Sequence, residues 1–205
     1  MNASWILALA AATAACSNKS EPGAAGSATT LPTGSATTTA PSPSAIPDGE
    51  IAAIVVAANQ VDIDAGQLAL QKATNAEVKK LAERMVTDHT AVNKSAFELV
   101  TRQRIEPVQS DTSKSLLAGG AETRAKLAAL DGAAFDKAYV DNEVAYHQAV
   151  IDVLKTKLIP STQNKELRDA LVGVAPAFDA HLAHAKQVQA ALAGGGPVAE
   201  HEHAK

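Results

Sequence analysis

Four long stretches of the chain carry apolar residues at helical spacing. Apolar side chains recur there every three or four positions, which places them on one face of a helix. The stretches cover about residues 48–73, 75–106, 132–159 and 163–193. Asp48 is the expected N-cap of the first helix and Asn75 that of the second, because a short polar side chain accepts hydrogen bonds from free backbone amides. Pro107 is expected to end the second helix.

Glycine and proline punctuate the rest of this region. Gly119-Gly120 is predicted to break a shorter helical stretch, residues 110–130, and Pro160-Ser161-Thr162 to separate the third long helix from the fourth. Pro176 lies inside the fourth helix, where it should remove a backbone hydrogen bond and kink the helix. No stretch alternates in the manner of a strand. We therefore expect an all-α antiparallel four-helix bundle with a short extra helical segment between the second and third long helices.

Polar side chains that can bind metal interrupt every apolar stripe. Glu143 and His147 lie four positions apart and His181 and His184 three apart, so each pair shares a helix face. Each long helix therefore directs at least one such group toward the core. The candidate metal ligands are Asp62, His89, Glu143, His147, His181 and His184.

The levels of these side chains along the bundle can be compared by counting from the connections. Asp62 lies about 12 residues before the first turn and His89 about 14 after it, which places them at nearly one level in a hairpin. His147 and His181 match less well across the Pro160 connection, with a difference of roughly 9 Å at 1.5 Å per residue. The sequence thus predicts one close pair and one pair that needs an uneven connection.

Two interpretations of the polar cluster stay open. Imidazoles and carboxylates from facing helices could bind a transition metal such as iron, zinc or copper. Alternatively, the same groups could form a satisfied hydrogen-bond layer that fixes the register of the helices. The Glu-x-x-His pattern of di-iron bundles is absent, because Val86 and Phe178 stand three residues before His89 and His181. Asp88 is expected to point away from the cluster and to pair with Arg84.

The first 47 residues have a different composition. Residues 1–16 contain an apolar run of signal-peptide length, and Thr13-Ala14-Ala15-Cys16 resembles a bacterial lipobox. That resemblance implies a lipid on Cys16, a membrane as partner, and an outer-membrane lipoprotein facing the periplasm. Ordinary cleavage after Ala14 would instead leave a soluble periplasmic protein. Residues 17–47, rich in Ser, Thr, Ala and Pro, predict a disordered linker, residues 48–193 the bundle, and residues 194–205 a disordered tail.

Charge and motifs exclude several functions. The net charge of -4, with no basic face, argues against nucleic acid as a partner. The sequence has no Gly-rich phosphate loop, no nucleophile elbow and only one cysteine, so no nucleophilic enzyme site is visible. Three functions remain: a binding or structural module of the envelope, a metal-binding or redox protein, and a homo-oligomer formed through helix faces.

Several short motifs resemble a known family. They are Gly66-Gln67-Leu68-Ala69-Leu70, then residues 85–90 (MVTDHT), Phe135-Asp136-Lys137-Ala138-Tyr139 with His147, and Pro176 with His181-Leu182. Over residues 48–193 the chain resembles the bacterial envelope proteins designated domain of unknown function 4142. The resemblance implies export and a ferritin-like four-helix fold, with no established activity, and the family's usual first-helix acid is Glu where this chain has Asp62.

Overall fold

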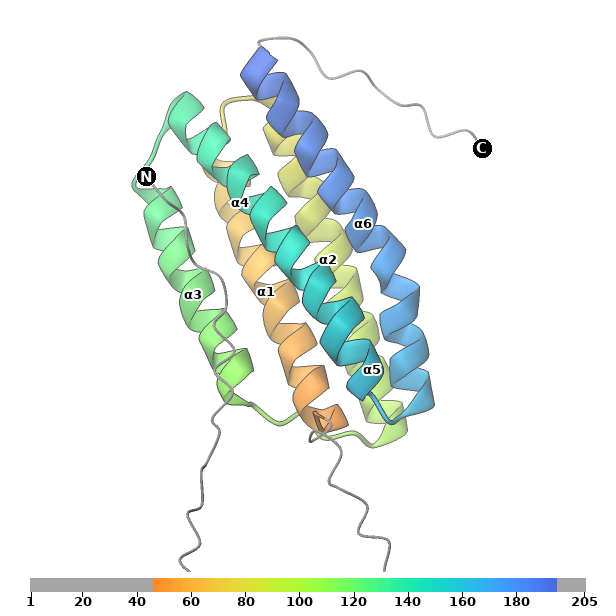
Figure 1. Ribbon diagram of the computed structural model, residues 1–205. Helices are drawn as coiled ribbons and strands as arrows, with labels where there is room; N and C mark the ends of the chain where they lie inside the picture. The colour runs from red at the N-terminus through yellow and green to blue at the C-terminus, as the bar shows by residue number, and fades with distance from the viewer. Residues whose placement is uncertain (1–45, 195–205) are drawn as a thin grey trace, which may run out of the picture. The chain divides into compact units, whose positions relative to one another are not determined.

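The computed structural model describes residues 46–194, and its regular structure is entirely helical there (Figure 1). The all-α bundle predicted from the apolar pattern is confirmed for this part of the chain. The signal peptide, Cys16, most of the predicted linker and the C-terminal tail lie outside the described residues. The helices are α1 (Asp48–Lys72), α2 (Ala76–Gln103), α3 (Asp111–Ala128), α4 (Gly132–Val153), the π-helix η1 (Leu154–Leu158), α5 (Ile159–Ser161) and α6 (Lys165–Gly194).

Asn75 and Asp136 together fix the turn between α1 and α2. The Asn75 side chain accepts hydrogen bonds from the amides of Glu77 and Val78, so the predicted cap is confirmed. Asp136, buried near the start of α4, accepts hydrogen bonds from the amides of Thr74 and Asn75 and from the Thr74 hydroxyl. These bonds tie α4 to the α1–α2 turn and set its height relative to both helices.

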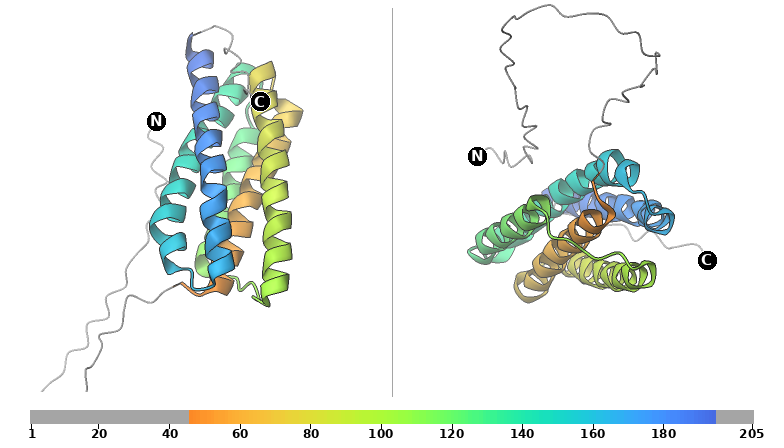
Figure 2. Two further views of the ribbon diagram at one scale, coloured as in Figure 1. Left: turned by 90° about the vertical axis from the view of Figure 1, so that its right-hand side faces the viewer. Right: turned by 90° about the horizontal axis from the view of Figure 1, so that it is seen from below.

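Helix α1 is enclosed on several sides, by α2, α3 and α4 (Figures 1 and 2). Its buried residues therefore occupy most of its circumference, in contrast to the single apolar face predicted from the sequence. The predicted break at Gly119-Gly120 is wrong, because α3 runs through both glycines. Gly120 lies against Val61 of α1, and a Cβ atom there would stand 2.5 Å from a Val61 methyl group. The glycine allows the two helices to approach closely rather than ending α3.

The connection between α4 and α6 also differs from the prediction. Pro160 does not separate the helices, since α4 continues through η1 and α5 as far as Ser161. The wider π turn ends at Leu158, two residues before Pro160, whose ring would clash with the preceding turn of a regular α-helix. Asp48 is the first residue of α1 rather than its N-cap, and its carboxylate accepts hydrogen bonds from the amides of Gln163 and Asn164. It thus fastens this connection to the start of α1.

Helix α6 continues to Gly194 with Pro176 in its interior. Among the described helices, none has both the length and the apolar character needed to cross a bilayer. The buried apolar residues form two clusters, one around Phe135 and Tyr139 and the other around Ile51 and Phe178. Between these two cores, α1, α2, α4 and α6 each contribute buried polar residues.

Candidate metal centre

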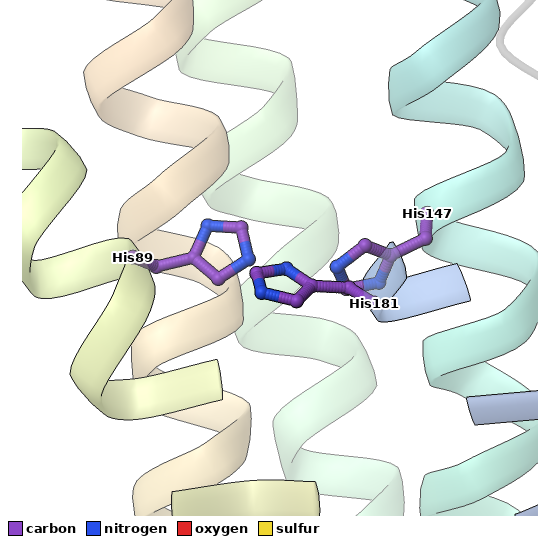
Figure 3. Close-up of side chains that lie close together, drawn as sticks. All are labelled: His89, His147 and His181. Atoms are coloured by element: carbon purple, nitrogen blue, oxygen red, sulfur yellow. The ribbon is translucent and has the colours of Figure 1, made fainter. Parts of the chain in front are cut away.

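Five of the six candidate ligands meet in the layer between the two apolar cores. Asp62, His89, Glu143, His147 and His181 are each at most 3% exposed. Figure 3 shows the three imidazole rings directed toward one another from α2, α4 and α6, and their ring centres are 5.2–5.5 Å apart. The layer is thus built from all four helices that the sequence pattern indicated.

The hydrogen bond of His89 determines which of its nitrogens faces the cluster. Nδ1 lies 2.8 Å from Oδ1 of Asn59, while Nδ2 of Asn59 donates to Asn93. Because the Asn59 oxygen can only accept, Nδ1 of His89 carries a proton. Nε2 lies 2.9 Å from Oδ2 of Asp62 but has no hydrogen-bond partner in the protein, because the contact is poorly aligned.

His147 is held by the backbone of its own helix. Nδ1 donates a hydrogen bond of 3.0 Å to the carbonyl oxygen of Glu143, one turn earlier. A carbonyl oxygen only accepts, so the proton is on Nδ1 and the lone pair of the neutral ring is on Nε2. Nε2 has no hydrogen-bond partner in the protein and lies 3.4 Å from Oδ2 of Asp62.

His181 is oriented by Asp88, in contrast to the expected role of Asp88 away from the cluster. Nε2 of His181 donates to Oδ2 of Asp88 across 2.8 Å, and Nε of Arg84 lies 3.4 Å from the same oxygen. Asp88 thus also has its expected contact with Arg84. The side chain can reach His181 because α6 packs beside α2 at this level. Nδ1 of His181 is buried and has no hydrogen-bond partner in the protein.

The three histidines therefore each leave one ring nitrogen without a hydrogen-bond partner in one buried space. One ring nitrogen from each lies within 4.8 Å of those of the other two. Burial lowers the pKa of His147, and His89 lowers it further, which outweighs the opposite effect of Asp62. Burial likewise lowers the pKa of His181 to about 4, against the raising effect of Asp88. Both rings are neutral near pH 7, the form in which imidazole binds metal.

The carboxylate of Asp62 lies beside these nitrogens. Burial alone would raise its pKa, but His89 and His147 outweigh this and keep the pKa below the usual value for Asp. Ligand atoms about 2.0–2.1 Å from one tetrahedral ion lie roughly 3.3 Å from one another. The contacts of Asp62 Oδ2 with the Nε2 atoms of His89 and His147, at 2.9 and 3.4 Å, are close to that spacing.

Glu143 contributes a second acid, fully buried next to Asp62. Burial raises its pKa well above the usual value for Glu, and the charge of Asp62 adds to this effect. Neither oxygen of Glu143 has a hydrogen-bond donor in the protein, and the hydroxyl of Tyr139 is also buried and unpartnered. Asp62, Glu143 and His147 form a second set in which one ligand atom from each lies within 4.8 Å of the others.

His184 does not join either set of converging ligands. It is half-buried on α6, one turn beyond His181, with an unpartnered Nδ1. Burial lowers its pKa, as does Arg84, while Glu77 raises it.

Two residues that orient the cluster, Asn59 and Asp88, were not among the sequence candidates. Asn59 could have been found one turn before Asp62 and Ile63 on a buried face, whereas only the packing of α6 against α2 identifies Asp88.

The predicted mismatch between His147 and His181 is also resolved. His147 precedes the end of α5 by 14 residues, and His181 follows the start of α6 by 16. The difference of two residues corresponds to about 3 Å rather than 9 Å. The larger value arose because the third helix was expected to end before Pro160 and the fourth to begin directly after Thr162, whereas α5 continues to Ser161 and α6 begins at Lys165.

The donor set is three imidazole nitrogens and one carboxylate oxygen, with a second carboxyl group beside it. Imidazole suits zinc, copper, iron and nickel, whereas magnesium and calcium prefer sites made only of oxygen. Each histidine is held through its other nitrogen by an amide, a backbone carbonyl or a carboxylate, which is the usual arrangement around metal-binding histidines. These groups could therefore hold a transition-metal ion.

Comparison with known proteins places the chain in a family. Its residues 32–188 match the family described as "Domain of unknown function (DUF4142)". None of the curated proteins compared with the chain is significantly similar to it in sequence. Among solved structures, the fold is similar to that of a candidate secreted protein of the DUF305 family from Streptomyces coelicolor. The TM-score is 0.58 and the identity 14%, over 74% of this chain and 96% of that one. Because the family match spans most of its length, the chain belongs to the DUF4142 family.

Proposed function

We propose that this protein is an exported, non-catalytic metal-binding module of the bacterial envelope. The proposed ligands are His89, His147, His181 and Asp62, and zinc is the ion that these donors fit best. The single observation that carries the proposal is the set of three buried imidazole nitrogens without hydrogen-bond partners in the protein. A layer that served only to fix helix register would have its polar atoms satisfied, because an unsatisfied buried group costs about 1–3 kcal/mol.

Zinc is favoured by the number and kind of the donors. Three imidazoles and one carboxylate make four ligands, which is the coordination number of closed zinc sites. Glu143 next to Asp62 gives the site a second potential negative charge, so a divalent ion could be balanced within the protein interior.

A binding role is favoured over a catalytic one because the donors are closed off. Catalytic zinc sites keep one position open to water or substrate. Here each of the five cluster residues is at most 3% exposed. The groove of about 850 Å³ between α1, α2, α3 and α6 is lined by none of the five. The DUF305 protein similar in fold is described as secreted, which supports an exported role.

Metal analysis tests the proposal. The chain is purified without chelator or affinity tag, and its zinc, copper and iron contents are measured by elemental analysis. We expect close to one transition-metal ion per chain in the wild type and at least a tenfold lower content in a His89→Ala/His147→Ala double variant. His184→Ala is the matched control and should retain the metal at equilibrium. An equally low metal content in the wild type and the double variant would contradict the proposal, provided that circular dichroism shows both proteins to be folded.

The location and assembly of the protein are further parts of the proposal. A lipid on Cys16 would hold the bundle at the membrane through residues 17–47, so Cys16→Ser should move the protein from the membrane to the soluble fraction. We also propose a ferritin-like arrangement for α1, α2, α4 and α6, the helices that contribute the buried polar layer. Homo-oligomers through helix faces would be detected by light scattering of the soluble domain, where a strict monomer would exclude them.

A further inference from the structure

The metal cluster has a polar contact with the surface on the seam between α2 and α6. The side chains of Asp62, His89, Glu143, His147 and His181 are 0–4% exposed. Asp88, which holds His181, has a side chain that is 41% exposed. A cation that approaches Asp88 from solvent is therefore one residue away from a proposed ligand.

His184 lies on the same seam, one turn from His181. It is half-buried, and its Nδ1 atom is buried without a hydrogen-bond partner in the protein. The charges of Arg84 and Glu77 on α2 both act on His184, so this ring lies on the side of α6 that faces α2, the helix that carries Asp88. An imidazole on α6 and a carboxylate on α2 are the ligand types that the cluster itself contains.

Arg84 is the group that opposes a cation at this seam. Its Nε lies 3.4 Å from Asp88 Oδ2, and the two side chains are 36% and 41% exposed. The pair is therefore screened by solvent and weak, and the flexible arginine can leave Asp88 at small cost. Arg84 should slow the arrival of a cation without preventing it.

A second polar contact with the surface runs through Asn59 and Asn93. Asn93 is half-buried and lines the groove of about 850 Å³. This path ends at the protonated Nδ1 of His89, just as the α2–α6 seam ends at the protonated Nε2 of His181. It offers only amides, which are poorer ligands for transition metals than imidazole or carboxylate. The α2–α6 seam is the better path because it offers a carboxylate and an imidazole.

We propose that Asp88 and His184 form a receiving site for divalent transition-metal ions, which pass from there to His181 and the buried cluster. This inference rests on the proposed function, because it gives the route by which the same centre is filled. The receiving site determines how fast metal is bound, while the buried ligands determine how much is bound at equilibrium. Substitutions on the seam should therefore change the rate of loading and leave the capacity unchanged.

Stopped-flow loading of the full apo chain with cobalt(II) tests the receiving site. Cobalt(II) bound by nitrogen and oxygen in a tetrahedral site absorbs visible light, so both rate and final amplitude are recorded. We expect His184→Gln to slow loading about tenfold and Arg84→Gln to accelerate it about tenfold, the lower end of known electrostatic effects on association. Both variants should reach the wild-type amplitude. Lys155→Gln, which removes a positive charge that η1 places against Asp179 of α6, should load at the wild-type rate.

Each outcome either supports or overturns the inference. Wild-type rates in both His184→Gln and Arg84→Gln, with full amplitude, would overturn the receiving site while leaving the proposed function intact. A rate change in Asn93→Ala alone would place the route in the groove and would equally overturn it. If the wild type develops no cobalt absorption, the proposed function fails and the receiving site with it. Circular dichroism of each variant excludes unfolding as the cause of slow loading.

Discussion

The role of each histidine depends on the atom bound by its other ring nitrogen. Asn59, the Glu143 carbonyl and Asp88 each accept one N–H, and the other nitrogen of each ring is left in the cluster. Three different hydrogen-bond acceptors thus orient the three rings toward the same buried space. At this scale the protein resembles a centre whose ligands are oriented before the ion arrives, which reduces the ordering that binding requires.

The acid dependence of stability follows from the lowered pKa values. The pKa of His181 is about 4 in the folded chain against an ordinary value of 6.5 for histidine, so the unfolded chain binds more protons between these values. Stability should therefore fall as pH decreases from about 6.5 to about 4, by up to roughly 1.4 kcal/mol per pH unit for this group. The raised pKa of Glu143 acts in the opposite direction.

A variant isolates the contribution of His181. In His181→Gln the titrating group is lost, so the advantage of the apo wild type over the variant should be larger at pH 7 than at pH 4.5. Urea unfolding of both proteins in chelator, at both pH values, measures this difference. Parallel pH profiles of the two proteins would contradict a buried, neutral His181.

Two tyrosines on α4 offer a matched test of the unpartnered atoms. Tyr146 donates a hydrogen bond of 2.8 Å to the carbonyl of Ala58, whereas the Tyr139 hydroxyl has no partner in the protein. Removal of the hydroxyl group should therefore affect the stability of the apo chain differently at the two positions. We expect Tyr146→Phe to destabilise the apo chain by about 1 kcal/mol and Tyr139→Phe to leave it unchanged or more stable. Urea midpoints compare them, and equal losses would show that Tyr139 is satisfied.

The sequence predicted the residues of the buried cluster better than it predicted the groups that orient them. Asp62, His89, Glu143, His147 and His181 each interrupt an apolar stripe, so the helical period alone brings them to the core. The orientation of His181 by Asp88 depends on how α6 packs against α2, which no local pattern specifies. Asn59 is buried on α1 only because three helices surround that helix.

At the scale of the elements, the packing of the helices explains why residues typical of helix ends lie inside helices here. Gly119 and Gly120 form a pair typical of a helix end, yet α3 continues through both because Gly120 allows contact with Val61. Pro160 similarly lies within a helix because a π turn precedes it. Local propensity favours a break at these positions, and tertiary packing overrides it, so a single sequence could not have revealed the continuity.

The two glycines provide a matched test of this packing. A Cβ at Gly120 would stand 2.5 Å from Val61, whereas at Gly119 it would meet nothing within 4 Å. We expect Gly120→Ala to destabilise the chain by about 1–3 kcal/mol through overpacking. Gly119→Ala should stabilise it by roughly 0.5–1 kcal/mol through helix propensity. Thermal unfolding of both variants tests the contact, and a stabilising Gly120→Ala would show that α3 is not held against α1.

The variant Asp136→Ala tests whether the bonds between α4 and the α1–α2 turn set the height of the cluster along the bundle. Its carboxylate accepts three hydrogen bonds from Thr74 and Asn75, and it is buried. In Asp136→Ala these donors lose their partner, so the chain should be destabilised by about 2–4 kcal/mol. Asp141→Ala, which removes a half-buried carboxylate on the same helix, should cost less than about 1 kcal/mol. Guanidinium unfolding measures both, and equal losses would contradict a special role for the turn.

At the scale of the whole molecule, a polar layer divides the hydrophobic core into two clusters. Such a layer weakens the apo protein, because its unpartnered atoms lose hydration without gaining hydrogen bonds. An ion that binds the folded state alone would recover this loss. At a free zinc concentration 100 times the Kd the gain is about 2.7 kcal/mol. The melting temperature of the apo chain should therefore rise with added zinc, and a His89→Ala/His147→Ala variant should show no rise.

X-ray absorption spectroscopy of the zinc-loaded chain gives the sharpest test of the proposed centre. We expect a first shell of four nitrogen and oxygen atoms at about 2.0–2.1 Å, with the outer-shell scattering of three imidazole rings. In His181→Gln the imidazole count should fall from three to two, while in His184→Gln it should stay at three. A shell of oxygen atoms without imidazole scattering, or an imidazole count that does not change in His181→Gln, would contradict a zinc centre built from these three histidines.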